Sequence, residues 1–160
     1  MTDYNLLKKY IDKVTWHWSA TNYFWKPPHK NYHFVIDGDG RVVQYLSLMT
    51  VGAHTWRRNT GNIGIAFAAM WDDPKTSWFD CPIKDVQIEA MACLTAELMI
   101  KLNIPFENVH DHAFFAKLDK YWPYRWDIGD KEWVVRNKTK WYYQKLKSGE
   151  RKFKYTNVVF

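Results

Sequence analysis

Histidine is the residue type in this chain of 160 residues that offers the most chemistry. The six histidines are His17, His29, His33, His54, His110 and His112. The sequence lacks the motifs of a nucleophilic serine elbow, a phosphate-binding loop, a dinucleotide-binding turn and an H-E-x-x-H zinc helix. A catalytic zinc site takes about three ligands from His, Asp, Glu or Cys and leaves a position open to water, so the histidines favour a metal site.

The candidate ligands are His17, either His110 or His112, and one acidic residue. His17 lies in residues 14–20, whose apolar and polar side chains alternate as in a strand, which puts its imidazole on the polar face. His110 and His112 are two residues apart and would share one side of a strand, so their spacing does not choose between them. Because a single histidine is more often structural than a ligand, only a combination of ligands would identify a site.

The elements that must position these residues alternate between strands and helices. Residues 32–46 form two apolar runs around Asp-Gly-Asp-Gly, which predicts a hairpin because glycine readily takes the positive φ of a tight turn. Residues 63–69 predict a buried strand, and the apolar spacing from Pro82 predicts the main helix, which ends before Pro105. Residues 106–115 indicate a short strand that enters a loop or helix. The predicted fold class is α/β, or α+β, with a central mixed β-sheet flanked by helices.

The composition is typical of one soluble globular domain. Hydrophobic residues make up 47% of the chain and charged residues 25%, which excludes disordered, collagen-like and low-complexity proteins. No apolar run approaches the length of a membrane-spanning helix and no signal-peptide core is visible, so we expect a cytoplasmic protein until something releases it. Cys81 and Cys93 are too few for a disulfide framework and are expected to be thiols.

The positive charge is concentrated at the C-terminal end. Residues 137–160 hold seven Lys or Arg and one acidic residue, and so carry the whole formal net charge of +6. We therefore divide the chain into a main domain, residues 1–136, and a basic aromatic tail or hairpin, residues 137–160. Alternating runs in 141–160 predict the hairpin. Such a segment is expected either to meet an anionic wall polymer, a membrane surface or nucleic acid, or to be a solvated hairpin that closes the fold. Specific nucleic-acid binding is the weakest of these because the rest of the chain is neutral.

Several local motifs follow one another in the order seen in a known enzyme family. They are T-W-H-W-S-A-T (15–21), Y-H-F-V-I-D-G-D-G (32–40), G-A-H-T (52–55), N-T-G-N-I-G-I-A-F (59–67), H-A (112–113) and R-W-D (125–127). Together they resemble the zinc-dependent N-acetylmuramoyl-L-alanine amidases of the peptidoglycan-recognition-protein-like (PGRP-like, amidase 2) family, of the phage or prophage endolysin type. The resemblance spans roughly residues 14–130 and implies the fold of that family.

The resemblance implies one zinc ion per chain and a set of three ligands. The family's ligands fall on His17, His112 and Asp127, with His112 preferred to His110 because it is followed by Ala. Zinc held by two imidazoles and a carboxylate lowers the pKa of bound water from about 16 toward 7 and polarises the scissile carbonyl.

The resemblance also implies residues that act on the substrate. The family's tyrosine falls on Tyr32 and its basic residue on Arg125, two catalytic side chains able to stabilise an oxyanion. Arg125 stands where lysine is common, and its guanidinium stabilises charge but does not act as a base. His54 falls beside the substrate cleft, where it binds substrate or fixes a loop, and Trp122 and Trp126 offer flat faces for sugar rings, unless they belong to the core.

Two departures from the family pattern affect the cleft. Only fourteen residues separate His17 from Tyr32, where many relatives have a longer insertion, and this shortening would open one wall or displace Tyr32. Several relatives carry a Glu on the strand after I-G-I, whereas this chain has Ala66 and Ala68, so a base from that strand is absent. His33 is expected to point into the core or to lie behind the ligands rather than on the metal.

By this resemblance the protein is expected to be a bacteriolytic hydrolase that acts on a linear amide. It would cleave the bond between N-acetylmuramic acid and L-alanine of peptidoglycan as a monomer, reaching the cell wall from the cytoplasm through a holin-type pore. The alternative is a non-catalytic peptidoglycan-recognition module. Such a module usually lacks one of the three ligands, whereas His17, His112 and Asp127 are all present.

Overall fold

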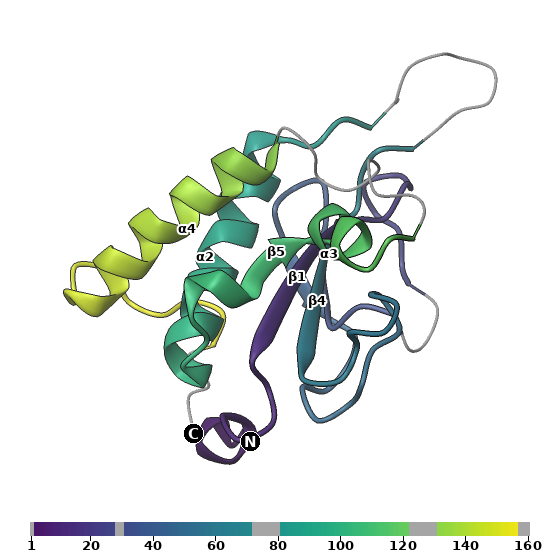
Figure 1. Ribbon diagram of the computed structural model, residues 1–160. Helices are drawn as coiled ribbons and strands as arrows, with labels where there is room; N and C mark the ends of the chain where they lie inside the picture. Colours follow the sequence, from purple (N-terminus) through teal and green to yellow (C-terminus); the bar gives the residue numbers. More distant parts are fainter. Residues whose placement is uncertain (1, 28–30, 72–80, 122–130, 157–160) are drawn as a thin grey trace.

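The structure, a computed structural model, describes residues 2–27, 31–71, 81–121 and 131–156 (Figure 1). Within these ranges, five strands form one sheet in the order β3-β2-β4-β1-β5. They are β1 (Lys13–Trp18), β2 (Phe34–Ile36), β3 (Val42–Gln44), β4 (Asn62–Phe67) and β5 (Val109–Asp111). The β2–β3 pair is antiparallel and the other three pairs are parallel, so the sheet is mixed as predicted.

Helices flank this sheet. Within the described ranges they are α1 (Tyr4–Leu7), α2 (Asp85–Leu102), α3 (His112–Leu118) and α4 (Lys131–Lys147), with a 3-10 helix, η1, at Phe106–Asn108. The main helix α2 covers one face of the sheet, and α4 packs against α2 (Figure 1). None of the helices in the described part of the chain is both long and apolar enough to span a membrane.

Side-chain alternation along β1 separates the core from the polar face of the sheet. Val14 and Trp16 are buried beneath α2, where Trp16 Nε1 donates to Thr95 Oγ1 at 2.9 Å. Thr15 and His17 therefore lie on the opposite face, beside Gly64 and Ala66 of β4. The predicted strand faces and the buried strand after residue 62 are confirmed.

The predicted hairpin and main helix are also confirmed. The turn between β2 and β3 uses Gly40 at a φ of 83°, a conformation that glycine adopts without strain. The helix α2 ends at Leu102, and the φ of 57° at the following Asn103 lies in the left-handed region that commonly closes helices. Cys81 and Cys93 are free thiols, as expected.

The predicted terminal hairpin is wrong, because its first part belongs to α4. Four side chains on one side of α4 are buried, namely Val135, Thr139, Tyr142 and Leu146. This helical spacing, rather than the apparent alternation after residue 141, determines the structure. The predicted domain boundary at residue 136 falls inside α4, and residues 150–156 pack back on α2, where buried Glu97 accepts the Tyr155 backbone N–H at 2.9 Å.

Candidate functional site

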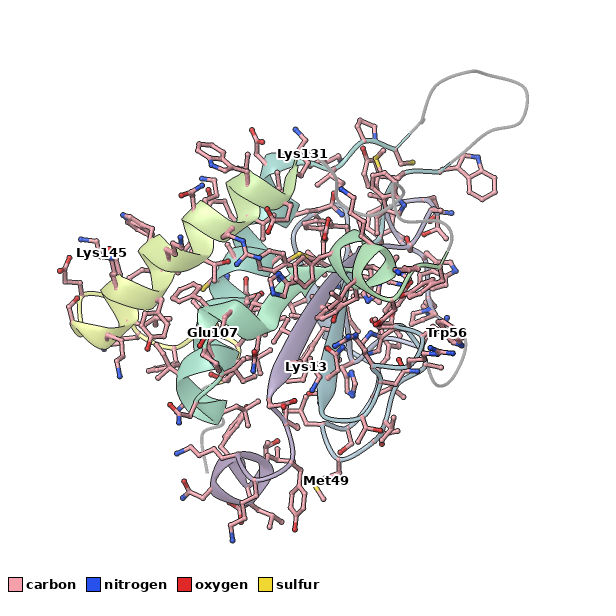
Figure 2. All side chains as sticks on the ribbon, viewed as in Figure 1. Lys13, Met49, Trp56, Glu107, Lys131 and Lys145 are labelled. Carbon is pink, nitrogen blue, oxygen red and sulfur yellow. The ribbon has the colours of Figure 1, made fainter. Side chains whose placement is uncertain are left out.

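A cleft of about 410 Å³ lies on the sheet face opposite α2, where β1 ends. Ends of parallel strands are where α/β sheets commonly bind ligands. The cleft is lined by His17, Trp18, Ala20, Tyr32, Ala53, His54, Thr55, Trp56, Asn59 and His112. Figure 2 shows Trp56, one of these residues, on the side of the molecule away from Lys145 of α4.

Four of the predicted site residues meet in this cleft. The His17 ring lies 4.9 Å from the His112 ring and 5.0 Å from the Tyr32 ring, measured between centroids. His17 Nε2 lies 3.1 Å from His54 Nδ1, and His17 is only 1% exposed. Tyr32 therefore lies beside His17 despite the short segment between them.

The structure separates the two candidate histidines near residue 110. β5 ends at Asp111, and Asp111 caps α3 by accepting the Phe114 backbone N–H at 2.9 Å. His112 is the first residue of α3 and faces His17. His110 stacks on Phe114 at 3.6 Å and bonds the Glu107 carbonyl through Nε2 at 2.7 Å, so its ring belongs to a different contact.

Three contacts fix the orientation of His54. Its Nε2 donates to the Asn62 carbonyl at 3.0 Å, which leaves Nδ1 as the acceptor that faces His17 and Thr55. Asn59 Oδ1 accepts the backbone N–H groups of His54 and Thr55 at 3.0 and 2.7 Å. The ring lies so close to Gly64 that a Cβ there would be 2.6 Å from His54 Cγ.

The electrostatics of the cleft keep two imidazoles neutral at physiological pH. Burial holds the pKa of His17 well below its ordinary value, and the neighbouring His54 and His112 lower it further. Burial also lowers the pKa of His54 to about 3, against the opposing effect of its bond to Asn62. A neutral imidazole offers the lone pair that a metal ion requires, so His17 fits the role of a ligand.

The remaining predicted site residues, Trp122, Arg125, Trp126 and Asp127, lie outside the described residues. Within those residues, no three His, Cys, Asp or Glu side chains form a group that could hold a metal ion. His17 and His112 offer two imidazoles of a kind that suits zinc, and a zinc site at this cleft would need a further ligand.

Sequence reasoning missed the residues that support His112. Tyr121 OH lies 2.7 Å from His112 Nε2, and the Tyr121 ring packs on Trp56 at 5.1 Å. Arg58 binds Asp119 through two hydrogen bonds of 2.6 and 2.9 Å, which joins the His54 loop to the end of α3. No local motif marks these partners, since each pair forms only when distant segments meet.

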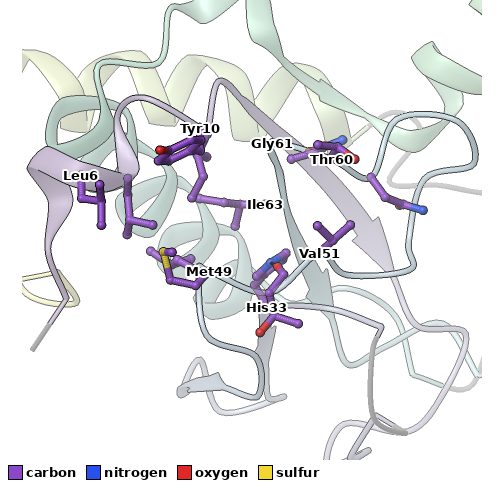
Figure 3. Close-up of a pocket in the computed structure, with 14 residues that line it drawn as sticks. Leu6, Tyr10, His33, Met49, Val51, Thr60, Gly61 and Ile63 are labelled. Atoms are coloured by element: carbon purple, nitrogen blue, oxygen red, sulfur yellow. Dashed lines mark hydrogen bonds between the residues drawn. The ribbon is translucent and has the colours of Figure 1, made fainter.

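A second pocket, of about 370 Å³, shares Asn59 with the cleft and is mainly apolar (Figure 3). Its wall includes Tyr10, Met49, Val51 and Ile63, together with His33. His33 Nδ1 accepts the Gly64 backbone N–H at 3.1 Å, and Nε2 donates to the Thr50 carbonyl at 2.8 Å. His33 is thus a buried structural residue 5.9 Å from the His54 ring.

Comparison with known proteins identifies the family. A family model described as N-acetylmuramoyl-L-alanine amidase, Amidase_2, matches residues 7–130. The chain belongs to this family. No curated protein sequence matches the chain.

Solved structures share the Amidase_2 fold with this chain. The N-acetylmuramoyl-L-alanine amidase LysC from Clostridium intestinale URNW is 21% identical, with a TM-score of 0.51 over 66% of this chain and 72% of LysC. The Ph2119 endolysin from Thermus scotoductus MAT2119 bacteriophage Ph2119 is 17% identical, with a TM-score of 0.57 over 81% of this chain and 84% of that chain. A chain in the structure of tracheal cytotoxin bound to the ectodomain complex of the peptidoglycan recognition proteins LCa and LCx is 23% identical. Its TM-score is 0.50, over 71% of this chain and 83% of that chain.

Proposed function

We propose that this amidase, whose family cleaves the bond between N-acetylmuramic acid and L-alanine in peptidoglycan, works with one zinc ion held by His17, His112 and Asp127. The observation that carries the proposal is the meeting of two imidazoles, from β1 and α3, at one cleft. Bound there, zinc would supply Lewis-acid polarisation of the carbonyl and activation of water.

The side chains of this chain would supply charge stabilisation and positioning. Addition of water to the amide carbon builds an oxyanion, which Tyr32 and Arg125 stabilise as donors; the C–N bond then breaks and the L-alanine amine leaves with a proton. The position of Tyr32 beside His17 supports this role. His54 holds His17 in position, and Trp122 and Trp126 stack on the sugar.

The first test is zinc content, measured together with the clearing of purified murein with and without a chelator. We expect about one zinc per chain and chelator-sensitive release of L-alanine amino termini without new reducing sugars. His17→Ala and Asp127→Ala should lose both zinc and activity. His110→Ala is the matched control and should lose neither, because its ring contacts Phe114 instead.

A second variant separates catalysis from metal binding. Arg125→Ala should retain zinc and lower turnover by about 10²-fold, the usual effect of losing one oxyanion donor. Loss of zinc in this variant would contradict the catalytic role of Arg125. Murein binding without zinc or cleavage in the unaltered protein would instead favour a recognition module.

We also propose the biological setting that endolysin-type motifs suggest. The enzyme would act as a monomer on the wall, after release from the cytoplasm through a holin-type pore. The +6 charge of residues 137–160 supports an anionic partner for this end of the chain, either a wall polymer or a membrane surface. The molar mass of the purified protein in solution, measured by analytical ultracentrifugation, tests whether it is a monomer.

A further inference from the structure

The outward side of α4 exposes two large aromatic side chains. Trp133 is 71% exposed and Trp141 is 47% exposed. The buried side chains of this helix, from Val135 to Leu146, lie on the other side of it. With about 3.6 residues per turn, the two tryptophans project within about 80° of each other and about 12 Å apart along the axis. Solvent-facing tryptophans on one helix face are typical of an interaction surface.

The same helix carries positive charge beside these tryptophans. Residues 131–156 contain nine Lys or Arg and two Glu, whereas the rest of the chain has a net charge of −1. Lys140 and Lys147 fall on the Trp133 side of the helix, and neither makes a salt bridge with any described residue. Arg151 lies 5.8 Å from the Trp141 ring. The surface therefore combines cations with amphipathic rings.

This surface lies on the opposite side of the molecule from the cleft. The helix α4 packs on α2, α2 covers one face of the sheet, and His17 lies on the other face. Figure 2 shows the same separation between Lys145 of α4 and Trp56 of the cleft. A partner bound to α4 would therefore leave the cleft open. Such a partner is distinct from the substrate whose amide bond is cut in the cleft.

We propose that the outward face of α4, with Trp133, Trp141, Lys140 and Lys147, binds the surface of an anionic phospholipid bilayer. Tryptophan favours the boundary between headgroups and acyl chains, and lysines near it are attracted to anionic lipids. This deepens the proposed anionic partner of the C-terminal end and is independent of the zinc assignment.

The alternative partner, an anionic wall polymer, fits this face less well. A flexible polyanion is typically bound along a cationic groove. The hollow of about 420 Å³ beside Trp141 is lined by Glu89 as well as by basic residues. The Glu89 carboxylate already accepts hydrogen bonds from Lys138 and Tyr142. Anionic headgroups spread over a flat surface reach Lys140 and Lys147 without entering that hollow.

Co-sedimentation of the full chain with vesicles tests the proposal. Binding is expected to vesicles of phosphatidylcholine with one third phosphatidylglycerol, to weaken with salt, and to be absent with phosphatidylcholine alone. Lys140→Gln with Lys147→Gln should weaken it about 25-fold, fivefold for each lysine. Lys8→Gln with Lys9→Gln, in the turn after α1, is the charge-matched control and should have little effect.

A second pair of substitutions, Trp133→Ser with Trp141→Ser, tests the aromatic side chains and should weaken vesicle binding by about tenfold or more. Trp71→Ser, at another exposed tryptophan, is its control. All these variants should clear purified murein at the normal rate, and His17→Ala should still bind vesicles, so failure here is distinguishable from failure of the zinc proposal. Equal binding by variants and controls, or binding only to a polyglycerol-phosphate polymer, would overturn the inference.

Discussion

At the scale of single residues, the contact between His54 and Gly64 sets the geometry of the cleft. A Gly64→Ala side chain would overlap the His54 ring, whose far side is held by the Asn62 carbonyl. We expect the unfolding free energy to fall by about 1–3 kcal/mol, the usual cost of overpacking. Urea denaturation measures this loss, and murein clearing should fall with it.

A double-variant cycle shows whether His54 causes this effect. In a His54→Ala background the ring is gone, so adding Gly64→Ala should cost much less. An equal loss of stability in both backgrounds would show that Gly64 is required for another reason.

The buried His33 makes stability depend on pH. Burial lowers the pKa of His33 below its ordinary value, so the folded chain stays unprotonated where the unfolded chain binds a proton. The stabilisation that neutral His33 contributes to the unfolding free energy is complete above about pH 6.5. It is lost progressively as the pH falls below that value. Denaturation of the chelated protein at pH 7.5 and 5.5 should show this decrease. A His33→Gln variant with an unchanged pH slope would contradict it.

The sequence allowed much of the cleft to be predicted, because the residues concerned sit in short motifs. His17 and Tyr32 lie in such motifs, and His112 could be preferred to His110 only through a family resemblance. The physical reason for the choice is that β5 ends at Asp111 and a helix follows. Tyr121 could not be predicted as a partner of His112, since nothing local to it indicates that contact.

At the scale of elements, the salt bridge between Arg58 and Asp119 holds α3 against the His54 loop. Arg58→Lys keeps the charge but loses the bidentate hydrogen bonding to Asp119. We expect His112 to shift relative to His54 and kcat to fall about tenfold. Arg41→Lys is the matched control, because Arg41 also pairs with an aspartate, Asp37, but on the distant hairpin. Steady-state kinetics on soluble muropeptides compare the two, and equal effects would argue against this role.

The carboxylate of Glu97 fastens the end of the chain to α2. It is buried and accepts backbone N–H groups from Lys154 and Tyr155. Glu97→Ala should lower the unfolding free energy by about 2–4 kcal/mol, because buried donors lose a charged acceptor. Glu89→Ala, which removes a half-exposed carboxylate from the same helix, should cost less. Thermal unfolding of both variants tests the order.

The one element type that was predicted wrongly shows where pattern reasoning is weakest. Residues after 141 alternate apolar and polar side chains over a short stretch, which predicts a strand. The buried positions of α4 follow a helical period that becomes visible only with the residues from 131 onward. Contact with α2, which is distant in the sequence, decides between the two periods.

At the scale of the whole molecule, zinc binding should stabilise the fold. A ligand that binds only the folded state at 100 times its Kd adds about 2.7 kcal/mol to the unfolding free energy. We expect zinc to raise the Tm of the chelated protein and magnesium not to, because imidazole ligands suit zinc and not magnesium. A rise of the same size in His17→Ala would contradict the assignment.

The order of the strands also determines when the sheet of this enzyme can form during synthesis. The interior strand β1 is made first, but its partners β4 and β5 begin 49 and 96 positions later in the chain. Parallel pairing over such separations is slow, since a long loop must close before any contact forms. On the ribosome β1 therefore has no partner strand until β4 is made, and the β5 side of β1 stays unpaired for longer still. A chain truncated before residue 112 lacks the second imidazole, and so no fragment released early would carry the cleft.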